Sequence, residues 1–373
     1  MSIGSYQISK LEIVISLISM IVGVGVLTLP RALANTVGTP DGWISLLIGA
    51  AINMFLVYLI VRLQRNYPGM SLIKFISNNV FGKYLSKALA LLFIFYFIFL
   101  LGYEARVLTI IIRIYLLDRT PSEVTAALIF LATTYAVTKG IQGIVHLNLL
   151  FFPIIVVVLV GLASFTIPQA EFDVLLPIAA DGIRPILMGV TDTLLAFLGI
   201  EILFFFLPYV TSKDLKANFF NMSIAFLTFL YMTIVVLCYA VLSFEATAIN
   251  AFPLVELAKE VEIIEGLIER VEPLLITIWI MSIFNTMAMI HFLAAKIIKE
   301  EFFTKTRFST IAIWIVFFGV FVTFGPNSIQ ETFTFGDYTA YFGFSLTILS
   351  LFFGYIFVWL KKKNSQQTKS EAI

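Results

Sequence analysis

The chain has 373 residues, of which 60% are hydrophobic and only 13% are charged, and its formal net charge is +1. A soluble domain is about one-quarter charged, so this composition excludes an ordinary soluble protein and indicates an integral membrane protein. The expected surroundings are therefore the lipid bilayer, and the nearly neutral charge gives no reason to expect nucleic acid as a partner.

Residues that could build a redox or metal site are scarce in this sequence. It contains one cysteine, Cys238, and two histidines, His146 and His291. A single cysteine excludes an intramolecular disulfide and a multi-cysteine metal site. Because no nucleophile–base arrangement or metal-ligand spacing is present either, we expect no enzyme activity, no metal and no cofactor.

Long apolar segments follow one another along the whole chain. At about 1.5 Å per residue, each is long enough to cross a hydrocarbon core of roughly 30 Å, although the uncharged part of the fourth, residues 124–138, is short. The sequence thus predicts ten transmembrane helices in a single transmembrane domain, 1–373. The predicted spans cover residues 11–35, 42–64, 84–116, 122–139, 146–167, 184–209, 217–244, 271–299, 307–325 and 336–360.

The first predicted span contains the stretch "IVGVGVLTLPR", which places Gly23, Gly25 and Pro30 in a run otherwise suited to a continuous helix. Glycine and proline are the poorest helix formers. The sixth span contains "AFLGIEILFFFLP", with Gly199 near its middle and Pro208 near its end. Both spans are therefore predicted to be broken.

The positions of these two breaks predict an inverted repeat. If ten spans divide into two sets of five, the second set enters the membrane from the opposite side, and spans one and six correspond. The first repeat covers about 11–167 and the second about 184–360. Such a 5+5 arrangement with broken helices 1 and 6 is the pattern expected of an all-α transporter built as an inverted repeat.

A break in a membrane helix also predicts a binding site. It frees backbone N–H groups at the start of one half-helix and C=O groups at the end of the other, which suit a carboxylate and an ammonium group. A small amino acid would fit there. The substrate-binding candidates at the breaks are Gly23, Val24, Gly25, Phe197, Leu198 and Gly199. The alternative is that the glycines only permit close helix packing.

Polar and aromatic residues in the third and eighth spans are further candidates for substrate binding. Tyr96 and Leu100 share one helix face with Tyr103, and Asn285 and Thr286 lie near the middle of the eighth span. The alternatives are an aromatic packing stripe for the first group and hydrogen bonds between helices for the second.

Two carboxylates within membrane depth are candidates for conformational coupling, because a charge in hydrocarbon is costly. Glu104 lies one turn beyond Leu100, and a structural ion pair with Arg106 or Arg31 is the alternative. Glu201 follows Gly199 by two positions and is preferred over Asp192, which lies nearer the outer end of its span.

Orientation follows from the distribution of Lys and Arg. With both termini cytoplasmic, the predicted inner segments are rich in basic residues, including Lys361, Lys362 and Lys363, whereas the outer segment 245–272 is acidic. Within it, residues 253–270 read "PLVELAKEVEIIEGLIER", with apolar residues at helical spacing. This pattern predicts an amphipathic helix on the outer face, or alternatively a solvated loop.

The stretches "GVGVLTLPRAL", "TPDGW", "FLGIEILFFFLP", "YEAR" and "LLDRTP" resemble the B subunit of bacterial spore germinant receptors (the GerAB type). That family is a branch of the amino acid–polyamine–organocation transporter superfamily. The resemblance implies a LeuT-like fold of ten helices, the inner membrane of the spore, and assembly with receptor A and C subunits. It also implies recognition of a small amino acid or similar nutrient.

Three functions are consistent with such a chain. The first is a nutrient germinant receptor subunit that binds a small amino acid at the membrane midplane and signals spore germination with partner subunits. The second is a secondary transporter of amino acids coupled to protons or Na⁺. The third is an ion or water pathway of the receptor. One pocket could serve all three, because a ligand stabilises whichever conformation it binds better.

Overall fold

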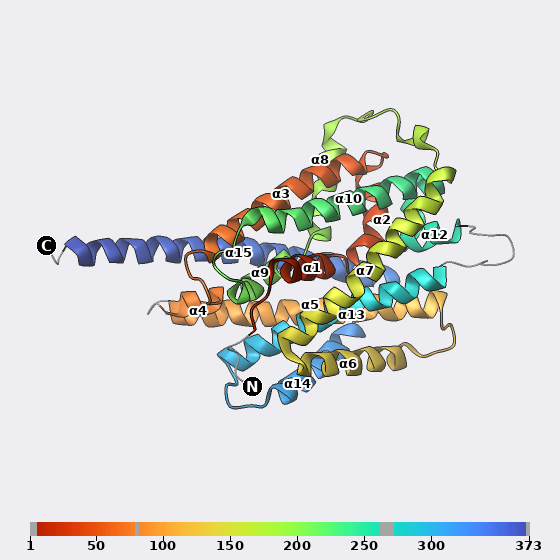
Figure 1. Cartoon of the computed structure of the whole chain (residues 1–373). Helices are drawn as coiled ribbons and strands as arrows, with labels where there is room; N and C mark the ends of the chain where they lie inside the picture. Colours follow the sequence, from red (N-terminus) through yellow and green to blue (C-terminus); the bar gives the residue numbers. More distant parts are fainter. Residues whose placement is uncertain (1–5, 79–81, 262–271, 371–373) are drawn as a thin grey trace.

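A computed structural model describes residues 6–78, 82–261 and 272–370 of the chain (Figure 1). Apart from an isolated parallel bridge between Ile8 and Val210, the regular secondary structure of these residues is helical. The α-helices are α1 (Lys10–Ile21), α2 (Gly25–Val37), α3 (Gly42–Gln64), α4 (Leu72–Ser77), α5 (Gly82–Tyr115), α6 (Ser122–Thr138), α7 (Gly140–Thr166), α8 (Ile183–Ala196), α9 (Leu203–Phe206), α10 (Ala217–Leu242), α11 (Phe244–Ile249), α12 (Pro253–Lys259), α13 (Glu272–Glu301), α14 (Phe308–Thr323) and α15 (Ile329–Ser370). Short 3₁₀ segments are η1 (Ile167–Gln169), η2 (Phe172–Leu175), η3 (Ile200–Ile202) and η4 (Leu207–Tyr209).

The described helices make this a multi-pass membrane protein. Six of them, namely α3, α5, α7 with η1, α10, α13 and α15, are long and apolar enough to cross a membrane alone. Two bent pairs, α1 with α2 and α8 with the segment Ile200–Tyr209, reach that length together. The apolar helices α6 and α14 have only 17 and 16 residues, so the count of ten spans stays a prediction.

The two helix breaks are where the glycines predicted them. The axes of α1 and α2 differ by 51°, and those of α8 and the segment that follows it differ by 44°. The prolines act differently from expectation. Pro30 lies inside α2 without interrupting it, and Pro208 lies in the first turn of η4, where a missing N–H costs little. The glycines are therefore the residues that coincide with the breaks.

The broken helices lie at the centre of the bundle. α2 packs against α8, and α3 packs against both of them, while α10, α11 and α12 contact α2, α15 contacts α8, and α13 contacts α1. Figure 1 shows that α3, α13 and α15 all end toward the same side of the molecule, where α15 extends beyond the bundle to the C-terminus. Because these ends carry Arg62, Arg65, Lys296, Lys299 and Lys361, we refer to this side as the basic end.

The segment predicted as an amphipathic outer helix, 253–270, is described only in part. Its first residues form α12, which packs against α2, α10 and α13. Leu254, Leu257 and Val261 are buried within the protein. The rest of the predicted helix, with Ile264 and Ile268, lies outside the described residues. The apolar face of the described part is therefore directed at the bundle.

Candidate functional site

The two breaks meet backbone to backbone in the middle of the protein. A Cβ atom on Gly25 would lie 3.2 Å from the carbonyl oxygen of Ala196, at the end of α8. A Cβ atom on Gly199 would lie 2.9 Å from side-chain atoms of Met20 and Ile21. Gly199 also has a φ of 124°, which residues with a side chain rarely adopt. Glycine is thus required at both contacts between the broken helices.

The first break is stabilised by side chains that bind its free carbonyl groups. Backbone polar groups at membrane depth need such partners, because no water is available in the hydrocarbon to replace them. Three bonds provide them: Trp279 Nε1 donates to Gly23 O at 3.0 Å, the Tyr231 hydroxyl to Ile21 O at 2.9 Å, and the Thr286 hydroxyl to Ser19 O at 3.2 Å. Side chains of α10 and α13 therefore stabilise the unwound backbone of the first break.

The second break is stabilised by one carboxylate, that of Glu201, which is fully buried. Glu201 Oε2 accepts the backbone N–H of Gly199 at 2.8 Å, and Oε1 accepts the hydroxyl of Tyr96 at 2.8 Å. Both oxygens are therefore occupied. Through Tyr96, this carboxylate ties the unwound residues of the second break to α5.

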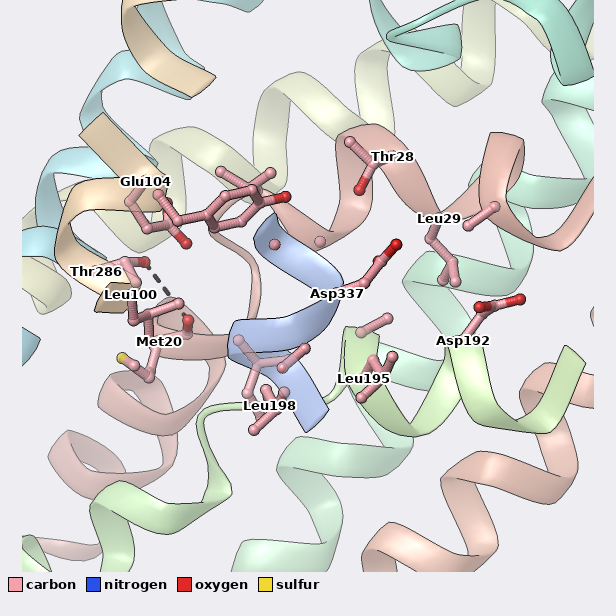
Figure 2. Close-up of a pocket in the computed structure, with 18 residues that line it drawn as sticks. Met20, Thr28, Leu29, Leu100, Glu104, Asp192, Leu195, Leu198, Thr286 and Asp337 are labelled. Carbon is pink, nitrogen blue, oxygen red and sulfur yellow. Dashed lines mark hydrogen bonds between the residues drawn. The ribbon is translucent and has the colours of Figure 1, made fainter. Parts of the chain in front are cut away.

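A cavity of about 120 Å³ lies where the breaks meet, between α2, α5, α8 and α15 (Figure 2). One water molecule needs about 10–15 Å³ of such space, so the cavity can take several waters or a small organic molecule. Glu104 lies at its buried side, with 5% of the residue exposed, whereas Asp337 is exposed at the other side. The cavity therefore leads from the helix breaks to an exposed mouth.

Three carboxylates line this cavity, and Figure 2 shows Asp337 between Glu104 and Asp192. None of the lining residues, all within the described part of the chain, is Lys, Arg or His. Glu104 interacts with the backbone of Val24, next to the start of α2. A carboxylate is favourable at that position, because the helix dipole is positive at its N-terminus.

Half of the residues predicted from the sequence line the cavity. They are Val24, Gly25, Leu100, Glu104, Leu198 and Thr286. The others do not line it: Gly23, Tyr96, Phe197, Gly199, Asn285 and Glu201. Phe197 packs against Tyr231 with ring centroids 5.4 Å apart, and a Cβ on Gly23 would lie 2.9 Å from the Thr286 hydroxyl. Gly23 therefore lies next to a residue that lines the cavity, whereas Phe197 packs against a residue that does not.

The preference for Glu201 over Asp192 as a coupling residue stays a prediction, and the two carboxylates differ in position. Asp192 lines the cavity, and Glu201 is turned away to the backbone of Gly199. The reason is local: η3 is a tight 3₁₀ turn, and Gly199 with positive φ directs its N–H back toward the Glu201 side chain. The spacing of these residues in the sequence does not reveal that Asp192, rather than Glu201, lines the cavity.

α15 contributes to the cavity, which was not predicted from the sequence. Gly336, Asp337 and Ala340 line the cavity, together with Thr28 and Ala32 from α2. The predicted last span began at residue 336, whereas α15 begins at Ile329, about two turns earlier. Asp337 therefore lies within the helix. An acidic residue next to a glycine in a long apolar run was the signal that could have identified it.

The arginines proposed as partners of Glu104 are engaged elsewhere. The guanidinium of Arg106 lies over the ring of Phe324 at 5.8 Å, and that of Arg31 lies over the ring of Phe333 at 4.9 Å. In the described residues, neither forms an ion pair with Glu104, and Glu104 Oε2 has no hydrogen-bond partner. The structural ion pair considered for Glu104 is therefore not present in this conformation.

Contacts at the basic end connect the segments on either side of the broken helices. The backbone N–H of Ile8 donates to Tyr209 O at 3.0 Å, and Lys10 Nζ lies 3.0 Å from Asp214 Oδ1. The hydroxyl of Thr211 and the ammonium group of Lys10 hold the pKa of Asp214 below its usual range. The chain before α1 is thereby joined to the chain after η4, on the side away from the cavity mouth.

Solved structures with a similar fold include MhsT in complex with L-phenylalanine, with a TM-score of 0.71 and 15% identity, covering 95% of this chain and 90% of that one. Another is Mhp1, a nucleobase-cation-symport-1 family transporter with bound bromovinylhydantoin, with a TM-score of 0.63 and 12% identity, covering 88% and 74%. These similarities confirm the LeuT-like fold with broken first and sixth spans.

Curated relatives are similar over most of their length. The spore germination protein YndE of Bacillus subtilis is 31% identical over 303 residues, which cover 81% of this chain and 83% of YndE. GerLB of Bacillus cereus is 28% identical over 365 residues, covering 97% and 96%. The relatives are germination proteins, and the structures with a similar fold are transporters. Neither group consists of enzymes, in agreement with the prediction from the sequence. Because the family model described as "Spore germination protein" matches residues 7–330, the chain belongs to the spore germination protein family.

Proposed function

We propose that this chain is the nutrient-binding subunit of a spore germinant receptor. In this proposal a small amino acid binds in the cavity between the broken helices and its occupancy is passed on to partner subunits. The observation that carries the proposal is the cavity itself, which lies at the meeting point of two helix breaks and is lined by both of them.

The arrangement of α2, α8 and α15 supports a sensing role. A ligand in the cavity would touch the start of α2, the end of α8 and α15 at once, through residues such as Gly25, Ala196 and Asp337. A ligand shifts a conformational equilibrium only if it binds one state better. Contact with three different helices provides such a difference whenever these helices move relative to each other.

The setting of this receptor is part of the same proposal. The family relationship supports the inner membrane of the spore as the location and receptor A and C subunits as partners. The basic end carries the lysines of α15, so by the positive-inside rule it would face the cytoplasm. Both termini would then be cytoplasmic, and the cavity mouth would face outward.

The experiment that tests this proposal compares binding with transport. Purified protein is titrated with labelled amino acids, and the same protein in proteoliposomes is assayed for uptake with imposed proton and Na⁺ gradients. We expect saturable binding without accumulation, and spores lacking the gene should lose the response to the bound nutrient. Accumulation against a gradient would instead assign a secondary transporter, and ligand-gated ion or water flux would assign a pathway of the receptor.

A further inference from the structure

We propose that the cavity selects organic ligands that carry more positive than negative charge, as basic amino acids and diamines do, over neutral zwitterionic amino acids. This inference rests on the proposed function, since it names the chemical class of the nutrient that the same cavity takes.

The described side chains that line the cavity include acidic groups but no basic ones. Glu104, Asp192 and Asp337 line the cavity, and no Lys, Arg or His does so among the described residues that form it. Arg31 interacts electrostatically with Asp337. One arginine beside three carboxyl groups makes the surroundings of the cavity more acidic than basic, which a cationic ligand would complement.

Within the described part of the chain, Glu104 is buried at the cavity without all of its hydrogen bonds. This side chain is buried, with 5% of the residue exposed, and its Oε2 atom has no hydrogen-bond partner in the described residues. Leaving a buried carboxyl oxygen without a hydrogen-bond partner is costly. An ammonium group of a ligand in the cavity would supply the missing donor, because nitrogen in such a group carries three N–H bonds.

Asp192 and Asp337 are two further acidic residues that line the cavity. Asp192 and Asp337 lie close enough to repel each other electrostatically. Asp192 bonds Thr36 with its side chain, while its Oδ2 atom is buried and has no partner in the described part of the protein. A second positive group of the ligand would relieve this repulsion. Figure 2 shows Asp337 between Glu104 and Asp192, so each amine of a ligand with two amines would have a carboxyl group to contact.

A neutral zwitterion fits this charge distribution less well. Its carboxylate would be favoured at the free N–H groups at the start of α2, but Glu104 already faces the backbone there at Val24. Anywhere else in the cavity the ligand carboxylate would approach Asp192 or Asp337. Like charges placed in such proximity are destabilising, so the zwitterion gains one favourable contact and suffers an unfavourable one.

The test is equilibrium binding of four compounds to the purified full-length protein in nanodiscs: L-lysine, cadaverine, L-alanine and L-leucine. We expect L-lysine and cadaverine to bind about tenfold or more tightly than the two neutral amino acids, the effect of one additional charged hydrogen bond. The variant Asp337→Asn should remove most of this preference. Because Asp337 is exposed, its neutralisation should leave the fold intact.

The matched control is Asp173→Asn, which removes the same charge from an exposed position in η2, outside the cavity. It should keep the preference for L-lysine and cadaverine. Tighter binding of L-alanine or L-leucine, or an unchanged preference in Asp337→Asn, would overturn the inference while leaving the proposed function in place. Failure of all four compounds to bind would overturn this inference, and failure across the wider set of labelled amino acids would overturn the proposed function as well.

Discussion

At the scale of single residues, Thr286 shows how one hydroxyl takes part in both the cavity and the backbone. The residue lines the cavity, and its hydroxyl donates to the carbonyl group of Ser19 at 3.2 Å. From the sequence, Thr286 was predicted as a ligand contact. In the structure its proton is already used for the break, so we expect its main contribution to be to the conformation of α1.

Replacing Thr286 by valine separates these two roles. Thr286→Val keeps the shape and removes the hydroxyl, leaving Ser19 O without this donor, so we expect a loss of about 1–3 kcal/mol in the free energy of unfolding without ligand. Thr286→Ser, which keeps the hydroxyl, should lose less. The measurement is thermal unfolding of both variants in nanodiscs. Unchanged stability of Thr286→Val combined with weaker nutrient binding would show instead that the hydroxyl binds only the ligand.

At the scale of elements, the second break depends on a bond between two helices. The hydroxyl of Tyr96 on α5 donates to Glu201, and Glu201 in turn accepts the backbone N–H of Gly199. Both residues were predicted from the sequence as functional, Tyr96 for ligand contact and Glu201 for coupling. Neither lines the cavity, so we expect them to act on the shape of the break rather than on the ligand directly.

Removing the Tyr96 hydroxyl tests this account of the second break. Tyr96→Phe takes one partner from a buried carboxylate, and a hydrogen bond to a charged group typically contributes about 1.5–3 kcal/mol, so stability should fall by that amount. Tyr115→Phe is the matched control, because Tyr115 donates a similar bond of 2.9 Å to Glu256, away from the cavity. We expect thermal unfolding to show a smaller effect for Tyr115→Phe, and ligand affinity to fall only in Tyr96→Phe. Full stability with reduced affinity in Tyr96→Phe would indicate direct ligand contact.

The elements could be predicted from the sequence to different degrees. Helix positions follow from hydropathy, which is a local property, and the breaks follow from Gly23, Gly25 and Gly199. The contribution of Asp337 could not be derived in this way. Whether a carboxylate at that position faces a cavity depends on how α15 packs against helices far away in the sequence. The direction of the Glu201 side chain likewise depends on the 3₁₀ turn that follows Gly199.

At the scale of the whole molecule, the structure has one basic end and a cavity with its mouth on the other side. The ion pair between Lys10 and Asp214 and the backbone bond between Ile8 and Tyr209 belong to the basic end. A receptor for an external nutrient requires that the cavity be reached from outside while this end faces the cytoplasm. The orientation of the chain is therefore part of the functional account.

Cysteine labelling tests this orientation. In a Cys238→Ala background, which removes the single native thiol, Asp173→Cys and Lys361→Cys place one thiol at each end of the molecule. An impermeant maleimide should label Asp173→Cys in intact cells and Lys361→Cys only after permeabilisation, because the basic segments are retained inside. The reverse pattern would show that the cavity mouth faces the cytoplasm.

Blocking the cavity tests the central claim that the nutrient binds between the broken helices. Gly25→Leu adds a side chain where even a Cβ atom would lie only 3.2 Å from Ala196 O, at the wall of the cavity. Gly161→Leu is the matched control, because no atom lies within 4 Å of a Cβ at that position in α7. The measurement is equilibrium binding of labelled amino acids, from L-alanine to L-lysine, to the purified wild type and both variants. We expect Gly161→Leu to bind these amino acids as tightly as the wild type does. Gly25→Leu should lose binding although its purified protein is as monodisperse as the wild type. Wild-type affinity in Gly25→Leu would contradict the account.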